Sequence, residues 1–451
     1  MNLRMEFQLL LRSPLLVVAT LAAALVTTLA LLAGIAQVRH FDATMREAIA
    51  FDARALADAQ STAASTPLDA GMFGYEMRFA VPHPAAPGAW FNLGDTLALP
   101  PVQRLRLLGL QGQVHDGTGG NPAARAAGAF DAAFVVAVLL PLLAVAVFAP
   151  LAAEEREARR DALLAALVAT PRSFWARRVA ARGALMLLPV LGPIVVALVA
   201  MGASPSLVLG VLGATTLYAL GWIGVCASLA LRLRGSSDAV AARLFTLWAL
   251  AALVLPALGG LALDRLAPPV PGSAIALVHR DAVNSAWDRP KSDTFEAFFA
   301  HHPEWRGTSP VTGRFHWKWY YAFHLVADRH VEPLLAEASA AKRDRQRSRD
   351  ALGWLLPTVA LQNLLDGLSD QGIEGDEARQ RAARDFHDRL RVAFYPFVFE
   401  ERLMGASDLA TLPTPSPSVR GLRHRPAAWG ALGVFALLGL GALWRSARRI
   451  G

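Results

Sequence analysis

The sequence predicts a mainly α-helical polytopic membrane protein, with six transmembrane helices and a large periplasmic α+β domain built from two loops. The first observation is composition, because 54% of the 451 residues are hydrophobic and 18% are charged. That is too apolar for a soluble protein of this length and too charged for a bare helical bundle. The second observation is six apolar runs, each near the roughly 20 residues that cross a bilayer.

The predicted spans carry prolines and glycines that should shape their packing. Prolines inside a span are expected to kink it. Glycines at regular spacing in the fourth span should allow close helix contact. A tight turn at Ser204-Pro205 should join the third and fourth spans as a hairpin. The spans cover residues 14–36, 130–152, 183–203, 206–230, 240–263 and 427–444, with Pro141, Pro189, Pro193 and Pro256 inside them and Gly210, Gly213, Gly221 and Gly224 in the fourth.

The chain divides into five parts on this basis. Residues 1–36 hold an amphipathic elbow helix and the first span. Residues 37–129 form the first outer segment, and residues 130–263 hold spans two to five with a cytoplasmic loop at 153–182. Residues 264–426 form the second outer segment, and residues 427–451 hold the sixth span with a cytoplasmic tail.

The first 13 residues are expected to form a short helix at the inner membrane interface. Leu3, Phe7 and Leu10 are apolar at helical spacing, while Arg4 and Glu6 are polar. The alternative is a frayed N-terminus. The first span lacks a small-residue cleavage site at the expected distance, so we interpret it as an uncleaved helix.

Arginines in the short loops predict the orientation. They precede the first span, fill the 153–182 loop, follow the fourth span and end the chain. With six spans, all these segments lie on one side, which the positive-inside rule makes cytoplasmic. Arg420, Arg423 and Arg425 precede the sixth span on the other side, but long translocated loops largely escape the rule.

The two outer segments are long enough to pack into one domain of roughly 250 residues. In the first, we expect a polar helix at 38–62 that continues the first span, then short strands near 72–81. The second is mainly helical in pattern, with helices expected at 290–301, 317–349, 351–369 and 375–394.

The 153–182 loop carries the strongest local pattern. Glutamates and arginines open it, and leucines at i, i+1 and i+4 then form one apolar helix face. Pro171 should end that helix, and Thr170 should cap the next one with Pro171 at its first position. Either this is a helix that docks another protein, or it is a solvated basic loop, which charge runs usually are.

This loop resembles the segment after the second span in permeases of type-2 ABC exporters. There an acidic cluster, a Leu-Leu-x-x-Pro-like pattern and basic residues form a coupling helix that rests in a cleft of a cytoplasmic ATPase. The family usually has a glycine soon after the glutamate, where this chain has Ala158-Arg159-Arg160. The matching residues here are Glu154, Glu155, Glu157, Leu163, Leu164, Leu167, Thr170, Pro171, Arg177 and Arg178.

The second outer segment also resembles a bacterial permease subfamily whose loop domain has no known function. The similarity rests on Trp354-Leu355-Leu356-Pro357, the run from Leu361 to Leu365, Phe386-His387 and Phe394-Tyr395-Pro396. The resemblance implies a permease in the bacterial inner membrane, with both termini cytoplasmic and the large loops periplasmic. It also implies two copies of a cytoplasmic ABC ATPase and a second permease subunit, as a homodimer or a heterodimer.

Several chemistries have no motif in this chain. It lacks a phosphate-binding Gly-x-x-x-x-Gly-Lys-Ser/Thr loop, so ATP and magnesium would bind the partner ATPase, and no cofactor is expected here. His-Glu-x-x-His and Gly-x-Ser-x-Gly are missing too, so we expect a non-catalytic subunit. The single Cys226 excludes an intrachain disulfide. The net charge of +8 is spread along the chain, which does not indicate nucleic-acid binding.

The eleven histidines all fall in the outer segments. His301-His302 and the run from His316 to His324 could supply imidazoles to a transition metal, but their spacing matches no tight ligand pattern. The alternative is packed or surface histidines in an aromatic-rich domain, whose tryptophans and tyrosines either build a core or face a ligand.

The function hypothesis is an export permease driven by a separate ATPase through the 154–182 segment, in contact with membrane lipids. The alternative is a membrane-anchored periplasmic scaffold or sensor without transport. Six kinked spans exceed what an anchor needs, which favours the permease. The substrate cannot be deduced from the sequence.

Overall fold

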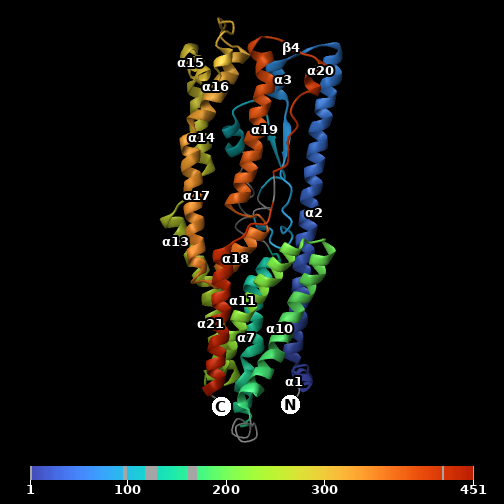
Figure 1. The fold of residues 1–451 in the computed structure, drawn as a ribbon, viewed down its shortest axis with the longest axis vertical. Helices are drawn as coiled ribbons and strands as arrows, with labels where there is room; N and C mark the ends of the chain where they lie inside the picture. Colours follow the sequence, from blue (N-terminus) through green and yellow to red (C-terminus); the bar gives the residue numbers. More distant parts are fainter. Residues whose placement is uncertain (1–2, 95–98, 117–129, 161–169, 419–420, 450–451) are drawn as a thin grey trace.

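The computed structural model describes residues 3–94, 99–116, 130–160, 170–418 and 421–449. The molecule is elongated, with a helical bundle at one end and a second helical body, here called the head, at the other (Figure 1). Both chain termini lie at the end of the bundle far from the head, here called the loop end. The described residues include six helices long and apolar enough to cross a membrane, as predicted.

The bundle contains the six spans in chain order. The first is the lower part of α2 (Pro14–Ser65), preceded by the elbow α1 (Leu3–Leu10). The second is built from α6 (Ala132–Phe134), η2 (Val135–Leu139), α7 (Leu140–Phe148) and α8 (Pro150–Glu157). The third and fourth are α10 (Pro171–Ala200) and α11 (Pro205–Arg232), the fifth is α12 (Ser237–Trp248), η3 (Ala249–Val254) and α13 (Leu255–Leu266), and the sixth is α21 (Pro426–Arg449).

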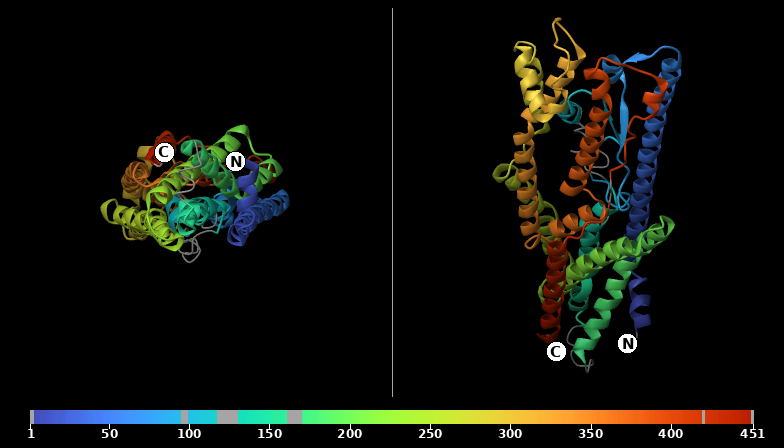
Figure 2. Two further views of the ribbon diagram at one scale, coloured as in Figure 1. Left: turned by 90° about the horizontal axis from the view of Figure 1, so that it is seen from below. Right: turned by 45° about the horizontal axis from the view of Figure 1, so that its top comes forward.

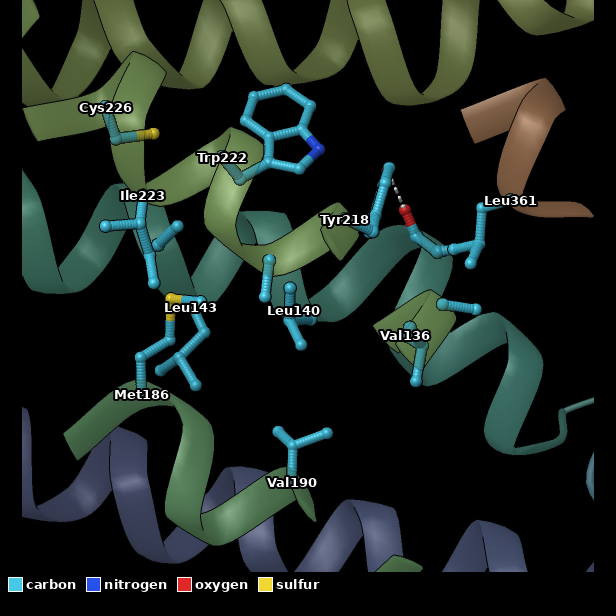
Figure 3. Packing of buried hydrophobic residues seen from close by; sticks show 14 of the residues in the cluster. Val136, Leu140, Leu143, Met186, Val190, Tyr218, Trp222, Ile223, Cys226 and Leu361 are labelled. Atoms are coloured by element: carbon cyan, nitrogen blue, oxygen red, sulfur yellow. Dashed lines mark hydrogen bonds between the residues drawn. The ribbon is translucent and has the colours of Figure 1, made fainter. Parts of the chain in front are cut away.

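The second and fourth spans form the centre of the bundle. In the most apolar window of each span, 72% of the second and 56% of the fourth are buried, against 17% of the fifth. Figure 3 shows this interior, where Leu140 and Leu143 of α7 face Met186 and Val190 of α10 and Tyr218 of α11. The fifth span is therefore a peripheral helix whose outer surface is exposed.

Glycines bring the fourth and sixth spans into backbone contact, as the sequence predicted. A Cβ atom added to Gly224 would lie 2.2 Å from the carbonyl carbon of Gly439, and one added to Gly439 would lie 2.5 Å from the Gly221 carbonyl oxygen. Any larger residue at these positions would push the helices apart.

The head combines both long segments. The helix α2 runs on past the bundle along the whole length of the head (Figures 1 and 2), so the predicted polar extension of the first span is confirmed. The head core is rich in aromatic residues and includes Phe298, Tyr321, Phe386 and Phe394. Its helices are α3 (Ala70–Glu76), α4 (Leu110–Asp116), α14 (Gly272–Ser285), α15 (Lys291–His301), η4 (Pro303–Trp305), α16 (Trp317–His330), α17 (Glu332–Gly353), α19 (Ile373–Phe399) and α20 (Ala406–Ala410).

Strand content in the described part of the head is small. The strand β1 (Leu68–Asp69) pairs antiparallel with β4 (Leu403–Met404), and β2 (Phe79–Pro82) pairs antiparallel with β3 (Val102–Leu105). The prediction of strands near 72–81 was therefore right only for its end. Residues 70–76 are helical because the Asp69 carboxylate accepts a hydrogen bond from Met72 N at 2.7 Å and caps α3.

The helix α18 (Pro357–Leu368) lies between the bundle and the head. It packs against the fourth and sixth spans and against both π-helical segments, η2 and η3. The predicted helices at 290–301 and 375–394 are confirmed, but the one at 317–349 is interrupted at Val331, where α16 ends and α17 begins. The helix α14 was not predicted.

Candidate functional site

The described part of the predicted coupling segment lies at the loop end of the bundle. The helix α8 ends at Glu157, and α10 begins at Pro171 with Thr170 in the N-cap position, as predicted. The Thr170 hydroxyl lies 2.6 Å from Ser173 Oγ and makes no side-chain cap bond to α10. The predicted apolar face of Leu163, Leu164 and Leu167 lies outside the described residues.

Glu155 and Arg178, both singled out from the sequence, meet in a buried ionic cluster. Arg178 Nη2 donates to Glu155 Oε1 at 2.8 Å, and Arg178 Nε lies 3.4 Å from Glu6 Oε2 of the elbow helix. Arg160 Nε binds the other Glu155 oxygen at 2.7 Å. The Arg178 guanidinium also lies 5.3 Å from the ring centre of Phe174. Opposite charges from α1, α8 and α10 are thereby joined, and we call this group the loop-end cluster.

Neighbouring contacts extend the loop-end cluster to two further places. Arg182 Nη1 donates to the Val147 carbonyl at 2.6 Å, and Arg182 Nη2 lies 3.7 Å from Glu154. Glu157 accepts a hydrogen bond of 2.6 Å from Ser237 N, at the first residue of the fifth span. The three predicted glutamates thus connect the second span to the third and the fifth.

Two residues differ from their sequence-based placement. Arg177 is exposed, and its contact is to Ser173 Oγ at 3.5 Å on its own helix, so it lies outside the cluster. Glu6 was placed among the polar residues of the elbow helix, yet it is buried. A lone glutamate on an amphipathic helix carries no signal for a partner 172 positions away in the sequence.

The head end of the bundle has a different construction, based on two π-helical segments. Each is followed by a proline, Pro141 after η2 and Pro256 after η3. Proline has no N–H, so Pro141 cannot bond the Ala137 carbonyl one turn before it. The Tyr218 hydroxyl donates to that oxygen at 2.8 Å. At Pro141, a side chain from the fourth span therefore replaces the helical bond that proline removes.

Two further side chains complete this polar network. Trp248 Nε1 donates to the Val138 carbonyl at 2.9 Å, which joins the fifth span to the second. Thr358 of α18 lies with its hydroxyl 2.9 Å from the Tyr218 hydroxyl and 3.4 Å from the Ala251 carbonyl of η3. The π-helical turns are thus held by specific contacts. Turns of this kind are frequent at functional sites.

A cavity of about 420 Å³ lies beside these turns, and we call it the junction cavity. The turns of the second and fifth spans nearest the head form one wall, and α17 and α18 form the other. The lining includes Phe134, Val138, Gly260, Leu263, Arg349 and Gln362. A second cavity of about 720 Å³ lies within the head, with Lys342, Arg345 and Arg379 among its lining residues.

The head holds its own buried ionic cluster, centred on Asp328 of α16. Arg391 Nη2 binds Asp328 Oδ2 at 2.5 Å, and His279 Nε2 lies 3.0 Å from Oδ1. The backbone N–H groups of Leu110 and Gln111 also donate to this carboxylate, at 2.8 and 2.9 Å, so it caps α4. We call this group the head cluster.

Electrostatics in the head cluster follow from burial and from this pairing. Burial alone would raise the pKa of Asp328, but Arg391 and His279 outweigh it and hold that pKa below its ordinary value. Burial lowers the pKa of His324 to about 3 and that of His387 to about 3. Both imidazoles are therefore neutral at ordinary pH, and His387 Nε2 donates to the Leu108 carbonyl at 2.7 Å.

The histidines considered as metal ligands do not converge in the described part of the chain. His302 contacts Glu304 at 2.8 Å, His316 accepts from Lys318 N at the start of α16, and His324 is packed against Tyr320. Among the described residues, no three His, Cys, Asp or Glu side chains gather as a metal site would require. The aromatic run of α16 contributes chiefly to packing, although Trp287 and Phe315 beside it are exposed.

Comparison with known families gives one match. Residues 273–416 match a domain of unknown function, DUF3526, which corresponds to about a third of the chain. The matched region runs from the start of α14 to the chain just after α20, and it contains Asp328, Arg391 and the cavity-lining residues Arg349 and Gln362. No curated protein and no solved structure matches the chain.

Proposed function

We propose that this chain is the membrane subunit of an ATP-driven transporter in a bacterial inner membrane, with export as the direction. The loop end is cytoplasmic and the head is periplasmic. A separate ABC ATPase, in two copies, binds the 154–182 segment, and a second permease chain completes the transport pathway. ATP and magnesium are held by the ATPase.

The observation that carries the proposal is the loop-end cluster. A segment that receives force from a motor must be connected firmly to the spans on both sides. Glu155 and Arg178 lie near the two ends of the segment and bind each other at 2.8 Å. Glu6 adds the elbow helix to this pair, and a separate, exposed contact of Glu157 with Ser237 N links the second span to the fifth. A solvated loop would not need the buried contacts of Arg178 with Glu155 and Glu6, since exposed ion pairs contribute little.

The end of the bundle next to the head has features that would let its helices bend and shift. Two spans carry π-helical turns and prolines, and helices of this kind bend at such turns. The fifth span is the least buried of the six, so it can shift with the smallest loss of packing. The sequence resemblance to type-2 ABC exporters adds the identity of the motor.

The test is purification of the native complex from a host that carries the neighbouring genes. We expect an ATPase to co-purify with the unmodified chain, and Leu164→Asp or Leu167→Asp to remove it while the chain still inserts. A charge on the apolar face of a docking helix is costly to bury. Leu403→Asp is the matched control, because Leu403 is 58% exposed on the head.

Two outcomes contradict the proposal. One is that both loop variants retain the ATPase as fully as the control does. The other is that the unmodified complex contains no ATPase, which favours the scaffold or sensor. Labelling of the 153–182 loop from outside the cell would overturn the proposed orientation.

A further inference from the structure

We propose that the junction cavity binds a lipid-like amphiphile, with an apolar chain between the second and fifth spans and a zwitterionic or uncharged polar headgroup at α17 and α18. That this amphiphile is the transported substrate rests on the proposed function, whereas its binding does not.

The first argument is that the cavity is two-sided. Its wall on the spans is apolar, with Phe134 and Val138 from the second span and Leu263 from the fifth. Its wall on the head side carries polar groups, with Arg349 from α17 and Gln362 from α18. A chain with a polar end matches both walls, while a fully polar solute would leave the apolar wall in contact with water.

The second argument is depth. Asp131 caps the second span, since its Oδ1 accepts from Phe134 N at 2.8 Å, and Leu266 ends the fifth span. The cavity lies between these two ends. Its apolar wall therefore belongs to the turns of both spans nearest the head, and its polar wall lies just beyond them. Acyl chains and headgroups of a bilayer meet at this level.

The third argument is the charge of the polar wall. Asp366 accepts from Asn92 Nδ2 at 3.1 Å and from Gln362 Nε2 at 2.9 Å, and it lies 3.3 Å from Arg349 Nη2. The positive charge of Arg349 is therefore offset, and the buried Asp131 adds a negative charge nearby. Such a wall offers hydrogen bonds but no net positive charge, which fits a zwitterionic or uncharged headgroup better than an anionic one.

The fourth argument is access from the membrane. Phe134, which lines the cavity, is 38% exposed, and on the fifth span Leu258 and Leu261 beside the lining residue Gly260 are 54% and 61% exposed. Pro256 and the π-helical turn before it limit how closely this helix can pack against the second span. A volume of about 420 Å³ lies within the range of small-molecule sites. A chain can thus enter sideways from the lipid.

The experiment uses the full chain, without any ATPase, in lipid nanodiscs. The probe is phosphatidylethanolamine with a photoactivatable diazirine in its acyl chain, and labelled peptides are mapped by mass spectrometry. We expect label to concentrate on residues 131–139, 256–263 and 349–362, above the level on other lipid-facing turns such as those around Gly192. The same probe with a phosphatidylglycerol headgroup should label these peptides several-fold less.

The blocking variant is Gly260→Phe, which fills the cavity. A Cβ atom added at Gly260 meets no atom within 4 Å, so the backbone can accept it. The matched control is Gly433→Phe in the sixth span, where an added Cβ also meets no atom within 4 Å. We expect Gly260→Phe to reduce label on the cavity peptides several-fold and Gly433→Phe to leave it unchanged.

A second measurement serves if Gly260→Phe fails to fold. Unlabelled lysophosphatidylethanolamine, which has one chain, is added to the unmodified protein and should displace the probe from the cavity peptides alone. If this ligand displaces the probe but excess two-chain lipid does not, the cavity binds a single-chain amphiphile. If both displace the probe, the cavity binds a membrane lipid. Either result supports the inference.

Two results would overturn it. One is equal labelling of cavity peptides in the Gly260→Phe and Gly433→Phe variants, and the other is labelling no greater than around Gly192. Neither result affects the proposed function, which depends on co-purification of the ATPase. Conversely, specific labelling in a protein that binds no ATPase would retain the lipid site and reject transport.

Discussion

The head cluster around Asp328 and the loop-end cluster around Glu155 both bury carboxylates against arginines, but their pairings differ. Asp328 binds Arg391 and two backbone N–H groups and lies 3.0 Å from His279, while the exposed Asp388 is a more distant partner of Arg391, at 3.9 Å. At the loop end, each central group has two partners. Arg178 contacts Glu155 and Glu6, and Glu155 contacts Arg178 and Arg160.

This difference separates a structural cluster from one that can rearrange. If one contact of Glu155 or Arg178 breaks, that central group retains another partner. If Asp328 is lost from the head, two backbone donors lose their acceptor, and Arg391 keeps only the exposed Asp388 at 3.9 Å. We infer that the head cluster fixes one conformation, whereas the loop-end cluster permits small shifts between helices. That property suits a joint next to the segment proposed to bind the ATPase.

The largest effect is expected from Asp328→Ala. It leaves a buried Arg391 without its carboxylate and removes the cap of α4, and breaking a buried pair costs about 3–5 kcal/mol. Hydrogen exchange on the full chain in detergent should show lost protection in residues 321–330 and 383–399 of the head. The fourth span, residues 205–232, should keep its protection.

The control for this change is Asp344→Ala. Asp344 pairs with Arg347 on the exposed surface of α17, with 59% and 78% of the two side chains exposed. Such pairs contribute roughly 0–1 kcal/mol, so exchange in the head should be unaltered. Similar protection in both variants would mean that the head does not depend on its buried cluster.

Acid should weaken the head before the bundle. The pKa of His324 and that of His387 are each lowered by burial to about 3. The unfolded chain takes up these protons near pH 6.5, so the stabilisation is complete above that pH and is lost as the pH falls toward 3. The slope is at most about 1.4 kcal/mol per pH unit for each imidazole. Asp328, whose pKa is also lowered, adds a loss only below about pH 4.

Thermal unfolding of the head between pH 7 and pH 4 measures this slope. His324→Phe keeps a flat ring beside Tyr320. It should lower the slope of stability against pH by the contribution of about one bound proton. The matched control is His301→Phe at the exposed end of α15, which should leave the slope unaltered. An unmodified head with equal stability at both pH values would contradict the assignment of neutral buried imidazoles.

The fold was predictable from the sequence where hydrophobicity alone determines it. Six apolar runs gave six helices, and the glycines of the fourth span gave its contact with Gly439. The break between α16 and α17 had a signal that was overlooked, since Pro333 lies in the first turn of α17, where proline is preferred. The Asp69 cap of α3 was a similar signal.

The sites were less predictable because their residues lie far apart in the chain. Glu155 and Arg178 were selected for a motif, and the structure places them in contact. Glu6 joins them from 172 positions before Arg178, and no periodicity links the two. The junction cavity likewise combines spans two and five with α17 and α18, and its residues become neighbours only after the bundle and the head have packed.

The smallest stability effect is expected from Arg178→Met, and this variant sharpens the comparison most. Glu6 loses Arg178, but Glu155 retains Arg160 and the methionine chain can pack near Phe174, so the loss should stay below the about 3–5 kcal/mol expected for Asp328→Ala. Coupling should suffer far more than stability, because the buried Glu155–Arg178 link between the second and third spans is gone. In the purified complex we expect ATP hydrolysis to continue while its dependence on substrate falls several-fold.

Arg177→Met is the control, since Arg177 is exposed one position away and lies outside the cluster. If Arg178→Met destabilised the chain as strongly as Asp328→Ala and left coupling intact, the loop-end cluster would be a structural cluster like the one in the head.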